Sequence, residues 1–140
     1  MNIIIDSREQ EPYSFRFPVL RKKLDAGDYS VEGFEKCIAV ERKSLTDFVH
    51  TIVRGRKRFH KELAKLRLYD SACVVVEGSL RSILEGKYHS DVHPNALIGS
   101  IMSIMQDFTV PVYFCHDRPT ACRFTEEYLA YYVKRSALCV

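Results

Sequence analysis

Apolar residues recur along the chain at two spacings, which predict strands and helices in turn. Short, nearly continuous apolar runs are typical of buried strands, and residues 2–6, 72–77 and 110–115 fit this pattern. Residues 22–24, 28–31 and 36–43 are expected to form three further strands. Apolar residues three and four positions apart are typical of helices on a core, and they occur in residues 45–53, 56–69, from 79 onward, 94–108 and 118–134. Strands followed by alternating helices and strands favour the α/β class, with a mixed central β-sheet flanked by α-helices.

One predicted hairpin gathers charged side chains. Gly33 suits a turn between the third and fourth segments, which places Asp28 and Glu41 together at the open end of the hairpin. Paired residues there approach to about 5 Å. Side chains alternate along a strand, so we expect Glu41 and Lys43 on one face and Arg42 on the other.

Two carboxylates this close are costly unless one is protonated or a cation lies between them. Magnesium prefers oxygen ligands and keeps several waters, so a pair of carboxylates with Lys43 beside it is consistent with phosphate chemistry. A plain surface ion pair between Glu41 and Lys43 explains the same residues. The pattern alone leaves both interpretations open.

Length and composition limit the kind of protein. At 140 residues, with 46% hydrophobic and 28% charged residues, we expect one domain over residues 1–140. No apolar run reaches the ~20 residues of a membrane span, and no signal peptide is evident. The five cysteines lack zinc-ligand spacing, and Cys37 and Cys73 lie in apolar runs. We therefore expect buried thiols, a reducing compartment and no membrane partner.

The charge is unevenly distributed. Residues 41–67 hold nine basic and three acidic residues, in a chain whose net charge is only +3. A concentrated basic segment is expected of a surface that meets a polyanion. A solvated helical face gives the same composition, so charge alone does not decide.

Four short motifs occur in one order: Asp6-Ser7-Arg8-Glu9, Gly27-Asp28, Glu41-Arg42-Lys43 with Asp47 four positions on, and Arg54-Gly55-Arg56. In this order and spacing the sequence resembles the XPF-type structure-specific endonucleases, a branch of the PD-(D/E)xK superfamily. The resemblance implies a restriction-endonuclease-like fold. Asp47 also lies three residues after Ser44, which is the spacing of a helix cap, and both roles can hold at once.

The resemblance implies a role for each matching residue. The catalytic positions would be Asp6, Arg8, Asp28, Glu41, Arg42, Lys43 and Asp47. The metal ligands would be Asp28, Glu41 and the main-chain carbonyl of Arg42, and Lys43 would position the attacking water. The DNA-binding residues would be Arg8, Arg54, Arg56, Lys57, Arg58 and Lys61, through phosphate contacts that carry no base specificity.

The function implied is a Mg²⁺-dependent endodeoxyribonuclease, with Mn²⁺ able to substitute, that hydrolyses one strand near a branched, flap or splayed-arm junction. Two alternatives remain: a non-catalytic DNA-binding subunit of a nuclease complex, and a sequence-reading nuclease of the same superfamily. We expect a stand-alone domain without the helicase or helix-hairpin-helix modules that family members often carry. The expected location is cytoplasmic, nucleoid-associated in a prokaryotic or phage setting and nuclear in a eukaryotic one.

The predicted helix at residues 94–108 is apolar around nearly its whole circumference, and Tyr128, Tyr131 and Tyr132 add aromatic surface to the last helix. All-round apolarity predicts full burial, in the core or at a subunit interface. Because the nuclease domains of the family pair through their C-terminal helices, the resemblance implies a homodimer, or else a partner subunit that targets the DNA.

Overall fold

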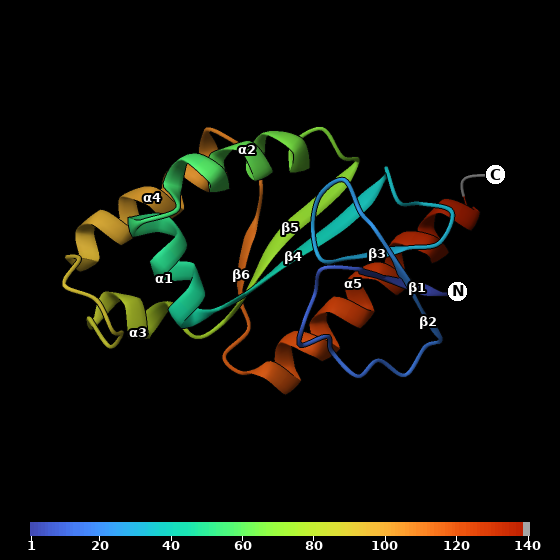
Figure 1. Ribbon diagram of the computed structural model, residues 1–140, viewed down its shortest axis with the longest axis horizontal. Coiled ribbons are helices and arrows are strands. Elements are labelled where there is room, and N and C mark those ends of the chain that lie inside the picture. The colour runs from blue at the N-terminus through green and yellow to red at the C-terminus, as the bar shows by residue number, and fades with distance from the viewer. Residues whose placement is uncertain (139–140) are drawn as a thin grey trace.

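Six strands form one mixed sheet, and helices cover both of its faces (Figure 1). The computed structural model describes residues 1–138. The strands are β1 (Ile3–Asp6), β2 (Val19–Lys22), β3 (Tyr29–Val31), β4 (Ile38–Ser44), β5 (Ser71–Glu77) and β6 (Val112–Phe114). The helices are α1 (Leu45–Val53), α2 (Arg56–Leu66), α3 (Leu80–Leu84), α4 (Pro94–Gln106) and α5 (Arg118–Leu138). The α/β class and the mixed sheet are confirmed.

The strand order is β2-β1-β3-β4-β5-β6. The hairpin between β3 and β4 is antiparallel, with Tyr29 opposite Val40, and Gly33 in its turn has φ +91°. Strand β3 also pairs antiparallel with β1, whereas β4, β5 and β6 run parallel to one another. The predicted hairpin is therefore present at the centre of the sheet.

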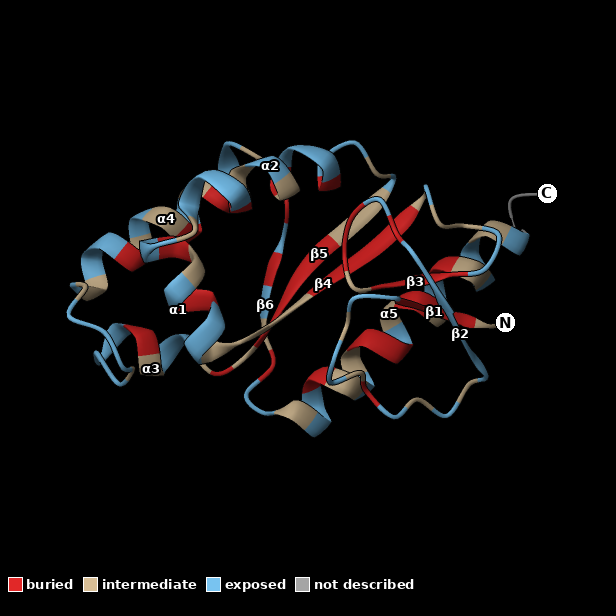
Figure 2. Ribbon diagram, in the orientation of Figure 1, coloured by how far each residue is buried: buried red, intermediate tan, exposed pale blue. Residues whose placement is uncertain are grey.

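Buried residues lie on the central strands and on helices on both faces of the sheet (Figure 2), and alternation along these strands divides the core into two layers. On β5, Val74 and Val76 face a core formed with α1 to α4, while Cys73 and Val75 face a core formed with α5. On β4, Ala39 belongs to the first core and Val40 to the second. Because this alternation continues along β4, it determines on which face of the sheet each charged side chain of the strand lies.

Two local signals determine the helices nearest the hairpin. Ser44 caps α1, and its side-chain oxygen accepts a hydrogen bond from the N–H of Asp47 at 3.1 Å. In α2, Phe59, Leu63 and Leu66 are buried and fix the face that packs on the core. The predicted cap and the predicted apolar face are both confirmed.

Several expectations are wrong in detail. The second strand is Val19–Lys22 and not residues 22–24. All four residues of this strand are exposed at the edge of the sheet, so no pattern of buried positions in the sequence shows where the strand begins and ends. Cys37 is only half-buried, whereas Cys73 is fully buried as expected. A further cysteine, Cys139, lies outside the described residues.

Helix α4 is only partly buried by its own chain. Leu97, Ile101 and Ile104 are buried, whereas Met102 is 38% exposed. Full burial within the chain is therefore wrong, and the homodimer stays a prediction. Within residues 1–138, the structure contains no helix with both the length and the apolarity needed to cross a membrane.

Candidate active site

The open end of the β3–β4 hairpin borders a cleft of about 470 Å³, which α1 and α2 close from the other side. The residues that line it are Asp6, Arg8, Glu9, Gly27, Asp28, Glu41, Lys43, His50, Thr51, Gly55, Arg58, Phe59 and Glu62. The sheet thus supplies carboxylates and a lysine, and the two helices supply the opposite wall.

Asp28 and Glu41 lie next to each other in this cleft. Glu41 is only 8% exposed. Burial raises its pKa well above the ordinary value, and the neighbouring Asp28 raises it further through its charge and a shared hydrogen bond. The Asp28 carboxylate accepts a hydrogen bond from the N–H of Arg42 at 2.7 Å, which holds its Oδ2 against β4. The pair therefore needs a proton or a cation.

Strand alternation places the rest of the β4 motif as expected. Lys43 lines the cleft with Glu41, and its Nζ lies 5.6 Å from the centre of the Phe59 ring. The side chain of Arg42 points to the opposite face of the sheet, where its Nε donates to Glu77 at 2.8 Å. The main-chain carbonyl of Arg42 lies on the strand between Glu41 and Lys43, which both line the cleft.

Asp6 and Arg8 form a pair at the edge of the cleft. The carboxylate of Asp6 accepts hydrogen bonds from Arg8 Nε at 2.9 Å and from the N–H of Leu24 at 2.8 Å. Burial alone would raise the pKa of Asp6, but these hydrogen bonds and the Arg8 charge hold it below the ordinary value. Asp6 therefore braces the loop at Leu24, while the exposed part of Arg8 faces the cleft.

The remaining predicted residues lie around the cleft. Asp47 is exposed on the first turn of α1 and is not among the residues that line the cleft. The five predicted DNA-binding residues that follow α1 are all exposed, and they are Arg54, Arg56, Lys57, Arg58 and Lys61. Arg58 lines the cleft itself.

The donor set fits a magnesium ion. Within residues 1–138, no three His, Cys, Asp or Glu side chains group as metal ligands. The ligand set that the family resemblance implies, Asp28, Glu41 and the carbonyl of Arg42, would leave water to complete the shell, as Mg²⁺ favours. The raised pKa of buried Glu41 beside Asp28 is what a cation would relieve.

A second cleft, of about 520 Å³, lies beyond the loop that carries Leu24. It is lined by lysines and carboxylates at the surface, and its Lys22 and Glu35 are already paired at 2.8 Å. Neither of its carboxylates, Asp25 and Glu35, is buried, whereas Glu41 in the smaller cleft is, so the smaller cleft is the candidate active site.

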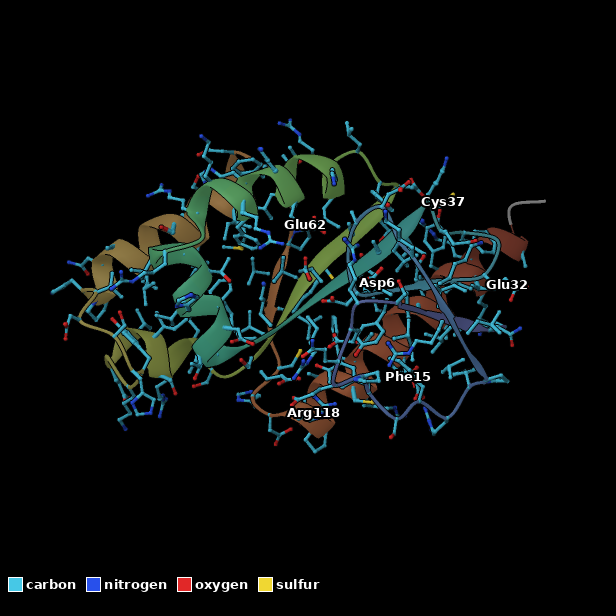
Figure 3. The ribbon with its side chains drawn as sticks, viewed as in Figure 1. Asp6, Phe15, Glu32, Cys37, Glu62 and Arg118 are labelled. Carbon is cyan, nitrogen blue, oxygen red and sulfur yellow. The ribbon has the colours of Figure 1, made fainter. Side chains whose placement is uncertain are left out.

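Sequence reasoning missed two contributors. Glu62, labelled in Figure 3 beneath α2, lines the cleft although it belongs to none of the four motifs. Glu77, at the end of β5, anchors Arg42. A signal for Glu62 existed, because it lies three residues after Phe59 on the buried side of α2. Nothing in the sequence pairs Glu77 with Arg42.

The sequence is similar to a known domain family and to a known protein. The ERCC4 domain family matches residues 5–128. A putative ATP-dependent RNA helicase of Methanocaldococcus jannaschii is 32% identical over 117 residues, which are 81% of this chain and 13% of that protein.

Two structures of XPF from Aeropyrum pernix superpose with a TM-score of 0.75. They are 22% and 21% identical, and the second is a complex with DNA. The matches cover 94% and 96% of this chain but only 61% and 66% of those chains. The fold is thus that of the XPF nuclease domain, and the chain belongs to the ERCC4 domain family.

Proposed function

We propose that this chain is a Mg²⁺-dependent endonuclease that hydrolyses one DNA strand near a branched or flap junction. The observation that carries the proposal is the buried Glu41 with the half-buried Asp28 and Lys43 beside it, in a cleft walled by a basic helix. Family membership and the likeness to an XPF that was solved with DNA support the same substrate class.

The basic residues bring the substrate to the cleft. Arg54, Lys57 and Lys61 are exposed around the start of α2, and Arg58 reaches the cleft wall. Contacts of this kind bind phosphates without reading bases. Selectivity for a junction would then come from the shape and flexibility of the DNA and not from a base sequence.

Hydrolysis requires a water oxygen to attack phosphorus while the bond to the leaving oxygen breaks. Asp28, Glu41 and the carbonyl of Arg42 would hold Mg²⁺, which supplies charge neutralisation at the phosphate and acidifies a bound water. Lys43 stands on the same face as Glu41, where its ammonium orients the water or offsets the charge on the phosphate. Phe59 beneath Lys43 restricts the lysine side chain.

The test is a nicking assay on a labelled panel: splayed arm, 3′ flap, 5′ flap, nicked duplex and plain duplex. Each is incubated with Mg²⁺, with EDTA, and with the Glu41→Gln variant. We expect cleavage near junctions that EDTA abolishes and that Glu41→Gln lowers by about 100-fold or more, with DNA affinity retained. Because burial already disfavours a charged Glu41, the neutral isostere should fold normally.

A matched control removes a carboxylate elsewhere. Glu85 is exposed after α3 and pairs with Lys87 at the surface, so Glu85→Gln should cleave as the unchanged protein does. Unchanged cleavage by Glu41→Gln would remove Glu41 from the chemistry. Binding without any cutting would favour a non-catalytic subunit, and preference for one sequence across junctions of equal shape would favour a sequence-reading nuclease.

A further inference from the structure

Glu62 makes a specific contact with the turn that precedes Asp28. Its Oε1 accepts a hydrogen bond from the N–H of Gly27 at 2.8 Å, across 35 positions of sequence. Because Gly27 is buried, removing the Glu62 carboxylate would take away the hydrogen-bond acceptor of a buried main-chain N–H. The contact joins α2 to the start of the hairpin.

The turn at Gly27 has little freedom to move on its own. Gly27 has φ +79°, and a Cβ there would lie 3.1 Å from the Cβ of Ala39 and 3.2 Å from the carbonyl oxygen of Val40. The next residue, Asp28, donates its N–H to that same carbonyl at 2.8 Å. The backbone of the turn thus packs against β4, and its position determines the direction of the Asp28 carboxylate.

One face of α2 makes two contacts with the cleft and a third with the loop that precedes Gly27. Phe59 packs under Lys43, Glu62 accepts from Gly27, and Lys65 Nζ lies 3.5 Å from the carbonyl oxygen of Asp25. These residues are three positions apart, so they lie along one side of the helix. In Figure 3 Glu62 extends from α2 toward the sheet.

We propose that Glu62 is a positioning residue, whose carboxylate holds the Gly27–Asp28 turn so that Asp28 presents its carboxylate to the cleft beside Glu41. The catalytic consequence rests on the proposed nuclease function, whereas the structural tie does not. Since α2 also carries the exposed cations Lys57 and Lys61, the helix that meets the DNA backbone also fixes one of the two catalytic carboxylates.

Two variants separate the hydrogen bond from the charge. Glu62→Gln keeps an oxygen acceptor for the Gly27 N–H but removes the negative charge, whereas Glu62→Ala removes both. Glu85→Ala, at an exposed carboxylate far along the chain, is the matched control. All are compared for unfolding temperature, DNA affinity, kcat, Mn²⁺ affinity by titration, and hydrogen exchange of the Gly27 amide.

For Glu62→Ala we expect a fall in kcat of about tenfold with unchanged DNA affinity, weaker Mn²⁺ binding, and Gly27 exchange at least about tenfold faster. Glu62→Gln should stay within about threefold on every readout because the acceptor remains. Equal losses for both variants would overturn the proposal in favour of a role for the charge. Normal Gly27 exchange and Mn²⁺ affinity in Glu62→Ala would overturn it outright.

The experiment also separates this proposal from the nuclease function. If the unchanged protein cuts no substrate, the proposed function fails, yet exchange at Gly27 and Mn²⁺ affinity still decide the role of Glu62. If the unchanged protein cuts and Glu62→Ala cuts equally well, only the positioning role fails.

Discussion

Replacing Arg42 by alanine tests whether the face of β4 opposite the cleft anchors the site strand. The guanidinium donates from Nε to Glu77 Oε2 at 2.8 Å and from Nη2 to Oε1 at 3.1 Å. The two side chains are only 12% and 9% exposed. Burial alone would raise the pKa of Glu77, but hydrogen bonds from Arg42 and Tyr13 hold it below its ordinary value.

The size of the stability loss depends on the hydrogen-bond and ion-pair partners that Glu77 retains. Removing one member of a buried ion pair costs about 3–5 kcal/mol, because the other charge is left unpaired. Glu77 would retain the Tyr13 hydroxyl at 2.5 Å and the more distant Arg118 at 3.8 Å. These partners place the loss for Arg42→Ala at about 3 kcal/mol. A domain of this size loses about 2–4 °C per kcal/mol, so the unfolding temperature should fall by about 6–12 °C.

The assay is a double-mutant cycle by urea unfolding with Arg42→Ala, Glu77→Gln and the pair. We expect a coupling of about 2 kcal/mol at pH 7, because the two groups touch. The pKa of Glu77 is lowered by folding, so its stabilisation is present above the ordinary value of 4.5 and disappears as the pH falls below it. Additive losses, or a fall of less than about 3 °C for Arg42→Ala, would refute a buried anchor and indicate a solvated pair.

Two further predictions concern the other face and the basic helix. Arg16→Ala should lower the free energy of unfolding at pH 7, because Arg16 Nε donates at 2.6 Å to Glu126, whose side chain is 3% exposed. Folding lowers the pKa of Glu126, so the loss of stability caused by Arg16→Ala, measured by urea unfolding, should become smaller below pH 4.5. An equal loss of stability at acid pH would contradict the pairing. Lys57→Ala with Lys61→Ala should reduce the salt dependence of DNA binding by about 2 in log–log slope, and an unchanged slope in a binding titration would place the DNA elsewhere.

The sequence was sufficient for features that depend on neighbours along the chain. The alternation of Glu41, Arg42 and Lys43 needs only the geometry of a strand, and all three side chains take the expected faces. The Ser44 cap needs only an oxygen and an N–H three residues apart. Both features could therefore be predicted without knowing any tertiary contact.

Features that depend on distant residues could not be predicted in this way. Strand β2 is exposed throughout and pairs parallel with β1, so no pattern of buried residues marks where it begins. The partnership of Glu62 with Gly27 crosses 35 positions, and that of Arg42 with Glu77 also crosses 35. Each requires two elements to be packed before the partners meet.

The alternation of β4 explains why an arginine stands between Glu41 and Lys43, the two residues of the motif that line the cleft. Glu41 and Lys43 face the α1–α2 side, where the cleft lies, and Arg42 faces the α5 side, where Glu77 and Tyr13 hold it. The Arg42 backbone N–H meanwhile donates to Asp28 in the cleft. One residue thus joins the buried anchor on one face to a proposed metal-binding carboxylate on the other. Loosening the anchor should therefore displace Asp28 as well as lower stability, whereas substitutions at Glu41 should alter the chemistry alone.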